Sequence, residues 1–483
     1  MSQTTEAENE QRGINFKGWY LSNAIDSASK ASVDQFLPIF ATQLGASTGI
    51  VGLLSGLYSL VNIFQIIWAS ISIRMKRISI FVVIGRFFSA IFYVPMAFLG
   101  VGQAFLLLVY RFFQGIFLSA VAPTQASLMA DHIPSSKRAQ RVNRFTQINL
   151  IGTLFGAMFG GFIFTIISDT LKFDTQISFL ILFFWTAFLG ILTAIIFHRS
   201  VSDVDNLYKI DPIILINQNL TIHAKPSKLG LMEKINAYFE KFKTFWTFTI
   251  FVAFFYFAVN VSSPFFIILE IEYYQFSFFQ ASLLSSLTTV VQFIVNIIVV
   301  KYNILDHFGR KFPLFCGILF LIISTLLIIV PYYFSVPTFT WCFLAWIILG
   351  LGWGIFNSAL TVMVLDLVHP QYRTTLIAVY NTFIGLTMFI SPILGGFIIE
   401  FFLNITIIFV VRSVLMILSI FLLVYVKEPE IPGMITHPIK YLYTKVFRTT
   451  PEGDSAVVIS PTHSIKSRFP HWMSNKRHYK LER

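Results

Sequence analysis

Three charged side chains recur at every fourth position in the segment from residue 18 to 42: Asp26, Lys30 and Asp34. A helix turns by about 100° per residue, so the three would lie within about 80° of one another, with Asn23 in the same stripe. Charges inside a membrane are costly and usually pair or face water. The stripe therefore predicts one of three arrangements: a structural ion pair in which Lys30 bridges both carboxylates, a site where one Asp binds a coupling proton or a cationic substrate, or partial exposure at a shifted helix end.

Arg111 is the second candidate, and it lies inside the apolar segment 103–130. Because a buried Arg keeps its proton, Arg111 cannot carry a proton itself, but it can stabilise a nearby carboxylate or hold an anionic substrate. Arg86 and Arg412 follow no motif, and we expect them to pack or to extend toward the membrane interfaces. The alternative is that Arg412 meets an acidic group: Glu400, Glu270 or Glu272.

Other polar side chains are sparse in the apolar segments. They predict a mostly apolar cavity with few directional contacts, and we expect about half of them to serve only as hydrogen bonds between helices. The candidates for contact with a substrate or a coupling ion are Gln114, Asn260, Gln292, Asn296, Asn357 and Asn381.

The composition indicates a membrane protein. Hydrophobic residues make up 56% of the 483 residues and charged residues 12%, against about 45–50% and about 25% in soluble domains. A water-soluble enzyme, a disordered regulator and a disulfide-rich secreted module are therefore excluded. Cys316 and Cys342 both lie in apolar runs, so they predict packing and neither a metal site nor a disulfide.

Twelve segments are long and apolar enough to cross a bilayer, which needs about 20 apolar residues. We therefore expect an all-α polytopic membrane protein with twelve transmembrane helices in two pseudo-symmetric six-helix bundles. The segments are 18–42, 48–71, 78–100, 103–130, 145–167, 177–198, 245–269, 279–301, 312–334, 338–367, 374–399 and 403–426.

The basic residues predict the orientation of the chain. If both termini are cytoplasmic, 30 of the 35 Lys and Arg lie in loops on that side, and the other side holds one, Lys172. Cytoplasmic loops of membrane proteins are enriched in Lys and Arg. The net charge of +12 therefore indicates orientation and contact with anionic inner-leaflet lipid, and no nucleic acid is needed to explain it. We expect a multi-pass protein of the cell (plasma) membrane.

The two halves of the chain repeat each other. A shift of 235 residues superposes Asp131 on Asp366 and Arg138 on Arg373, and it brings the glycine pair 160–161 onto the glycine pair 395–396. Paired six-helix repeats are typical of transporters that bind substrate between the halves. The expected organisation is an N-terminal segment (1–17), a first bundle (18–198), a cytoplasmic linker with a possible strand pair and an amphipathic helix (199–244), a second bundle (245–426) and a tail with an interfacial helix followed by disorder (427–483).

Four motifs resemble those of the major facilitator superfamily, most closely its proton-coupled multidrug and solute efflux branch. They cover nearly the whole region from about residue 18 to 428. The fourth-segment motif LVYRFFQGIF holds Arg111, Gln114 and Gly115; the glycine motif GTLFGAMFGG holds Gly152, Gly156, Gly160 and Gly161; the loop motif LDHFGRK holds Asp306, Gly309, Arg310 and Lys311; and SPILGG holds Pro392, Gly395 and Gly396.

The resemblance implies roles for these residues. It favours a coupling role for Arg111 and a gating role for the loop motif at the cytoplasmic face, where Asp131, Arg138, Asp366 and Arg373 can join the ion pairs. Ordinary interfacial charge is the alternative. The glycines predict close helix packing, with hinge or leak-sealing work as the alternative, and Pro392 predicts a bend. The first-half loop, ASISIRMKRIS, lacks the Asp and Gly, so the second-half loop is the better-preserved gate.

These features together predict a secondary transporter working by alternating access, without a cofactor and without enzymatic activity. The chain has no Gly-rich nucleotide-binding loop and no catalytic triad, so ATP hydrolysis within it is not expected. The first hypothesis is proton-coupled export of a small lipophilic or amphipathic compound by a monomer. Uptake by a proton-coupled symporter and a non-transporting membrane sensor derived from the same fold are the alternatives.

Overall fold

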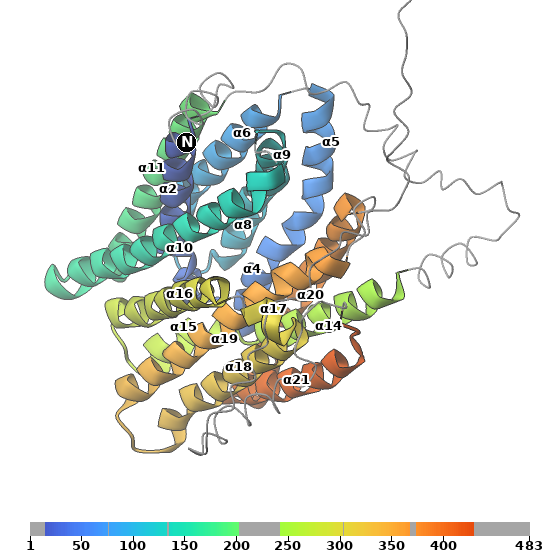
Figure 1. Cartoon of the computed structure of the whole chain (residues 1–483). Coiled ribbons are helices and arrows are strands. Elements are labelled where there is room, and N and C mark those ends of the chain that lie inside the picture. The colour runs from blue at the N-terminus through green and yellow to red at the C-terminus, as the bar shows by residue number, and fades with distance from the viewer. Residues whose placement is uncertain are drawn as a thin grey trace, which may run out of the picture. The chain divides into compact units, whose positions relative to one another are not determined.

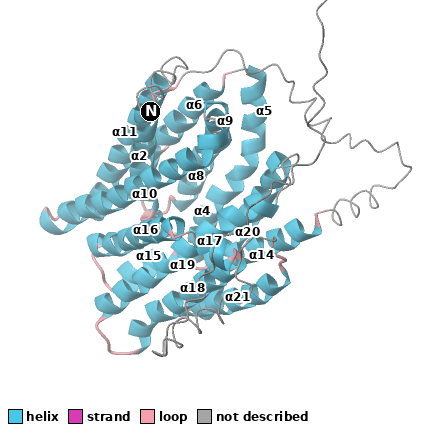
Figure 2. Ribbon diagram, in the orientation of Figure 1, coloured by secondary structure: helices cyan, strands magenta, loops and turns pink. Residues whose placement is uncertain are grey.

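A computed structural model describes residues 15–75, 77–132, 135–201, 242–302, 304–367 and 373–428 (Figure 1). In these ranges the chain forms helices joined by short loops, and Figure 2 shows no strand among them. The strand pair and the amphipathic helix expected in the linker, and the interfacial helix expected in the tail, lie outside the described residues. The domain boundaries drawn through them stay predictions.

Each of the first six predicted segments folds as helix. The elements of this N-terminal half are α2 (Phe16–Asp34), α3 (Leu37–Gln43), α4 (Thr48–Leu60), η1 (Val61–Phe64), α5 (Gln65–Met75), α6 (Ile78–Ile91), α7 (Tyr93–Met96), α8 (Ala104–Leu118), α9 (Val121–His132), α10 (Ser135–Thr165), η2 (Ile166–Thr170) and α11 (Thr175–Ser200).

The six segments of the second half fold as helix as well. The elements of this C-terminal half are α14 (Lys243–Asn260), α15 (Phe265–Ile268), η3 (Leu269–Tyr273), α16 (Phe278–Lys301), α17 (Ile304–Phe308), α18 (Lys311–Tyr333), α19 (Thr338–Leu367), α20 (Arg373–Phe402) and α21 (Thr406–Tyr425). The predicted all-helical fold class is confirmed.

Ten helical segments of the described residues are long and apolar enough to cross a membrane, and they correspond to the third to twelfth predicted spans. The first two spans are interrupted. In the first, Pro38 lies in the first turn of α3, where a residue without an amide hydrogen can begin a new helix. In the second, the 3-10 turn η1 leaves Thr48–Phe64 as a shorter apolar helix. The first break places Asp34 at the C-terminal end of α2.

Glycines allow α10 to lie directly against α2. A Cβ atom at Gly152, Gly156 or Gly160 would overlap the carbonyl oxygen of a residue in α2. The facing residues are Ala24, Ala28 and Ser32. Lipid gives no hydrophobic drive for helix association, so this close approach is what holds such helices together. The other side of α2 is fixed by Ser22 and Ser29, whose hydroxyls donate to backbone carbonyls of α11.

The two halves meet along α4 with α20 and along α10 with α16. Glycines again bring the backbones together: a Cβ at Gly52 would overlap the carbonyl of Pro392, and one at Gly396 would overlap that of Thr48. Pro392 lies inside α20, which continues through it to Phe402. The carbonyl of Pro392 therefore belongs to the contact between the halves.

Hydrogen bonds between the halves gather at one end of the helices. We call this the distal end; it is the end remote from residues 15 and 428. Gly49 N donates to Glu400 (2.9 Å), Thr42 Oγ1 to Glu272 (2.8 Å) and Phe279 N to Thr165 Oγ1 (3.1 Å). Gln35 with Ser282 and Ser285, and Thr48 with the carbonyl of Gly396, add hydrogen bonds between the halves in the distal half of the helices. We call this set of contacts the distal seal.

Candidate functional site

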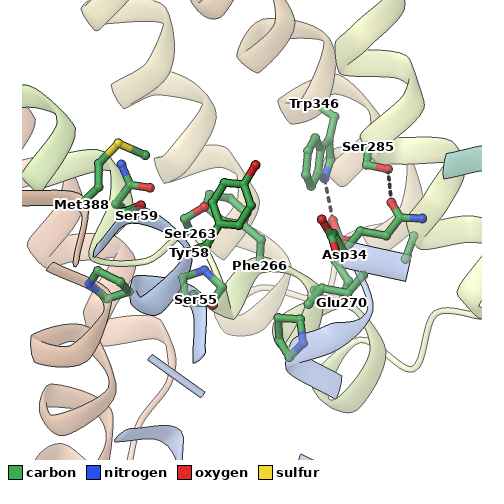
Figure 3. A pocket seen from close by; sticks show the side chains of 17 residues that line it. Asp34, Ser55, Tyr58, Ser59, Ser263, Phe266, Glu270, Ser285, Trp346 and Met388 are labelled. Atoms are coloured by element: carbon green, nitrogen blue, oxygen red, sulfur yellow. Dashed lines mark hydrogen bonds between the residues drawn. The ribbon is translucent and has the colours of Figure 1, made fainter. Parts of the chain in front are cut away.

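A cavity of about 320 Å³ lies between the two halves, next to the distal seal (Figure 3). Its walls combine apolar and aromatic side chains with two carboxylates, Asp34 and Glu270, and no Lys or Arg in the described part of the chain lines it. The lining residues are Asp34, Gln35, Pro38, Ser55, Tyr58, Ser59, Asn260, Ser263, Pro264, Phe266, Ile267, Glu270, Ala281, Ser285, Trp346, Met388 and Pro392. Each half supplies one of the two carboxylates.

Asp34 is held by groups of the N-terminal half. Its Oδ1 accepts from Arg111 Nη1 (3.0 Å) and from the Tyr93 hydroxyl (2.8 Å). Arg111 also donates to Gln114 Oε1 (2.6 Å) and lies over the ring of Tyr58 (5.2 Å). The structure thus brings the predicted residues Asp34, Arg111 and Gln114 together. The Arg111 guanidinium compensates the charge of this carboxylate.

Glu270 has a different environment. Its side chain is buried, with 1% of the residue exposed, and its Oε1 accepts from the indole Nε1 of Trp346 (2.6 Å), as Figure 3 shows. No Lys, Arg or His of the described residues forms an ion pair with it. Sequence reasoning considered Glu270 only as a partner for Arg412 and did not predict it as a site residue. A carboxylate within the run FFIILEIEYY is the signal that could have identified it.

The internal sequence repeat relates the surroundings of Asp34 to those of Glu270. The offset of 235 residues that superposes the halves places Arg111 on Trp346 and Asp34 on Leu269, the neighbour of Glu270. Each half therefore carries an acid–donor pair, in which the donors are at equivalent positions and the acids differ by one position. In the N-terminal half the donor is a guanidinium, and in the C-terminal half it is a neutral indole.

Asp26 and Lys30 belong to a second polar cluster, inside the N-terminal half. Lys30 Nζ lies 2.6 Å from Asp26 Oδ2, and Arg86 Nε lies 4.0 Å from the same oxygen. The expectation that Lys30 bridges both carboxylates is wrong for Asp34, because Arg111 takes that role. Arg86 shows the first of its two expected arrangements, since it packs inside the half and does not extend toward an interface. Arg86 is 1% exposed, lies over the ring of Phe197 and donates to Ser22 and Asn23.

Arg412 contacts no carboxylate among the described residues. Its Nη1 donates to Ser262 Oγ (3.1 Å), and its guanidinium lies over the ring of Phe266 (4.9 Å). Phe266 also lines the cavity. Arg412 is buried and packs against Phe266, which is one of the two expected arrangements. A position near a membrane interface and a pairing with one of the suggested acidic partners are both wrong.

The predicted amides separate into two groups. Asn260 lines the cavity, although its Nδ2 donates to the carbonyl of Tyr256 in the same helix (2.8 Å). Asn296 accepts from Ser358 (2.8 Å), which joins α16 to α19. Gln292, Asn296, Asn357 and Asn381 are not among the lining residues, and Asn381 is exposed. Asn296 thus forms a hydrogen bond between helices, as expected for about half of these residues.

Comparison with known proteins identifies the family. The model of the Major Facilitator Superfamily matches residues 19–303 and 248–434 of the chain. The chain belongs to the Major Facilitator Superfamily. This confirms the resemblance at the level of the superfamily, while the efflux branch stays a prediction.

A sequence relative and three solved structures are similar to this superfamily member. An uncharacterized MFS-type transporter of Methanocaldococcus jannaschii is 28% identical over 178 residues, which are 36% of this chain and 43% of that protein. The chain thus matches less than half the length of this relative.

The solved structures share the fold. A bacterial homolog of the human lysosomal transporter Spinster, in an inward-facing and unoccupied conformation, has a TM-score of 0.57 at 18% identity over 84% of this chain and 93% of that one. A POT family transporter in complex with 5-aminolevulinic acid has a TM-score of 0.63 at 15% identity (84% and 94%). The nucleoside transporter NupG has 0.63 at 13% identity (85% and 98%). These neighbours are named as transporters and none as an enzyme.

The loop motif of this superfamily member forms a network within the C-terminal half. Arg310 Nε lies 3.1 Å from Asp366 Oδ2, and Lys311 Nζ donates to the carbonyl of Val426 (3.0 Å). Glu428, which sequence reasoning missed, accepts from the backbone amides of Arg310 and Lys311. Gly309 has a φ of 76°, which favours glycine.

Four predicted gating side chains lie outside the described ones: Asp131, Arg138, Asp306 and Arg373. Their backbone lies in helices α9, α10, α17 and α20, at the end opposite the distal seal. The described ion pair between Arg310 and Asp366 joins α19 to the turn before α18, so it stays within one half. A gating role for this network stays a proposal.

Proposed function

We propose that the protein is a secondary transporter that exports a small lipophilic or amphipathic compound by alternating access, in exchange for protons. The observation that carries this proposal is the cavity shared by the two halves, with one carboxylate from each half in its wall. Asp34 has a guanidinium partner, and among the described residues Glu270 has only a neutral donor. A site with these two carboxylates can hold a fixed charge at one position and exchange a proton at the other.

Glu270 is the proposed proton carrier. A buried carboxylate without a cation is costly, and protonation removes that cost. The Trp346 indole can donate a hydrogen bond to either form of the carboxyl group, but it cannot neutralise a charge. When the cavity opens to water, the carboxylate gains hydration and can release its proton. Asp34, by contrast, forms an ion pair with Arg111, whose Nη1 lies 3.0 Å away.

The distal seal supports an inward-facing state. If the termini are cytoplasmic, as the loop charges predict, the seal closes the cavity toward the outside, and access remains from the cytoplasm. Transport then requires the seal to open and contacts at the opposite end to form. Glu400 and Glu272 each accept a hydrogen bond from the other half, so they are the groups whose release would open it.

The cavity wall supports an amphipathic substrate. Phe266, Trp346 and Tyr58 supply aromatic surface, and Met388 and Ile267 supply flexible apolar surface. A cavity of about 320 Å³ falls in the range of small-molecule sites. Asn260, Ser263 and Ser285 offer a few directional polar contacts.

Transport in inverted vesicles tests direction and coupling. Vesicles with an acidic lumen would be offered benzenesulfonate, benzenesulfonamide and phenyltrimethylammonium, three aromatic compounds that differ in charge. Export in exchange for protons predicts accumulation of at least one of them that depends on the acidic lumen. Accumulation that requires an alkaline lumen would instead indicate a proton-coupled uptake symporter. Accumulation of a compound without any effect of the pH gradient contradicts proton coupling.

A further inference from the structure

We propose that Lys30, Arg86 and Asn23 form an anion-binding subsite inside the N-terminal half, which takes a carboxylate, sulfonate or phosphate group. The ligand is either the acidic end of the transported compound or a free inorganic anion. This inference rests on the proposed function only in the first case, where it names the charged group of the substrate.

Charge is the first observation. Lys30 and Arg86 bring two cations to one carboxylate, Asp26, because Lys30 lies 2.6 Å and Arg86 lies 4.0 Å from the same Asp26 oxygen. Asp34 cannot supply the missing negative charge, since it is paired with Arg111. Among the described side chains, the cluster therefore keeps one positive charge in excess. A buried excess charge is costly unless a counter-charge reaches it.

Unused donors are the second observation. Arg86 Nε and Asn23 Nδ2 are buried and meet no acceptor among the described residues. The two side chains touch each other, because Arg86 Nη2 donates to Asn23 Oδ1. Both residues are more than nine-tenths buried. Two unsatisfied donors beside an excess positive charge fit an acceptor-rich anion, which would satisfy both.

Access is the third observation. Ala24, Ala28 and Ser32 face α10, and at about 100° per residue Lys30 lies on the opposite side of α2. That side carries Asp34, which lines the cavity. The Lys30 side chain is 25% exposed and that of Asp26 is 15% exposed. Lys30, one turn before Asp34, therefore lies on the face of α2 that borders the cavity, and its side chain is partly exposed.

The fold itself does not require this cluster. The repeat offset of 235 residues places Asp26 on Val261, Lys30 on Phe265 and Arg86 on Leu321. The C-terminal half thus builds the equivalent helices with apolar residues at all three positions, and these residues are buried in it. The charges of the N-terminal half are an addition to the common architecture, which is typical of a ligand site in a membrane protein.

Ligand-induced stabilisation of the purified full-length protein tests the proposal. The probes are benzenesulfonate, its neutral relative benzenesulfonamide, the cation phenyltrimethylammonium, and inorganic phosphate in the same buffer. We expect an anion to raise the melting temperature and the neutral and cationic probes to have a smaller effect. If only benzenesulfonate raises the melting temperature, the subsite binds the acidic end of a transported compound. If only phosphate raises it, the subsite binds a free inorganic anion. If neither anion stabilises the wild type more than the other probes do, the proposal is wrong.

Substitutions locate the site. Lys30→Met keeps the apolar stem and removes the charge, and we expect it to weaken anion binding at least tenfold, whereas Lys30→Arg retains binding. Lys243→Met removes an exposed lysine at the start of α14 and serves as the matched control with unchanged binding. Anion binding by Lys30→Met as tight as in the wild type would overturn the assignment.

Binding measured in this way needs no proton gradient, so it separates the two proposals. If gradient-driven transport occurs but no anion binds, the subsite fails and the proposed function stands. If anions bind but no transport responds to pH, the proposed function fails and the subsite stands.

Discussion

Individual charges inside the helices are the residues on which the account depends. Asp34 and Arg111 come from different helices, α2 and α8, and lie 3.0 Å apart with their side chains 27% and 8% exposed. Removing one partner of a buried pair leaves an uncompensated charge. The structure therefore predicts that the two residues depend on each other for stability.

Substitution of Asp34 tests this dependence. We expect Asp34→Asn to lower the free energy of unfolding by about 3 kcal/mol, because Arg111 loses its carboxylate. The double variant Asp34→Asn/Arg111→Gln restores part of the loss, since no charge is left unpaired. Thermal unfolding in detergent measures both. Asp174→Asn, which alters an exposed helix cap, is the control, and an equal loss in all three variants would contradict the pairing.

Part of this site was predictable from sequence. The spacing of four residues predicted the contact of Asp26 with Lys30, because that contact is local to one helix. The pairing of Asp34 with Arg111 joins residues 77 positions apart, and helix periodicity carries no information about it. Glu270 was missed as a site residue for the same reason: its role follows from burial and from Trp346 on another helix.

At the scale of elements, glycines determine how closely the helices approach. Gly152, Gly156 and Gly160 recur every fourth residue, and the sequence predicted their role in close packing. What the sequence did not specify is the partner. Gly160 meets α2 of its own half, whereas the adjacent Gly161 meets Ser282 of the other half.

A methyl group added at this contact should destabilise the protein. We expect Gly156→Ala to lower the free energy of unfolding by about 1–3 kcal/mol, because the new Cβ meets the backbone of Ala28, which cannot move aside. Gly100→Ala is the matched control, since nothing lies within 4 Å of a Cβ there. Comparison of the two melting curves checks this, and equal stability of both variants would show that α10 does not need its glycine.

In the proposed function, the distal seal is the element-scale feature that sets the state of the transporter. Glu400→Ala removes the acceptor of the Gly49 amide, which lies in the other half. We expect it to shift the population toward a state open at the distal end. Labels attached to the distal ends of α4 and α20 would report a longer mean distance.

The control for this shift is Gln103→Ala. It breaks a hydrogen bond of 3.0 Å at the distal end, but one that stays within the N-terminal half. We expect it to leave the distance between the labels unchanged. A Glu400→Ala protein with the wild-type distance would exclude a role for this hydrogen bond in closure.

At the scale of the whole molecule, the sequence predicted that the helices are arranged in two halves. It did not predict which end of the cavity between the halves is closed. Hydrophobic segments and the repeat offset define the helices and their order, because both are local or periodic properties. Which end is sealed depends on contacts between residues such as Thr48 and Gly396, which are far apart in the chain. The interruptions of the first two spans also depend on local turns that a count of apolar residues overlooks.

The central claim is that protonation of the cavity carboxylates is coupled to alternating access. The substitution Glu270→Gln tests this claim most directly. The amide is permanently neutral and keeps the size of the protonated acid. In proteoliposomes, two assays of a transported aromatic probe would be compared with the wild type: exchange without a pH gradient, and accumulation driven by one. The account predicts that Glu270→Gln retains exchange and loses accumulation. Accumulation at the wild-type level would contradict it.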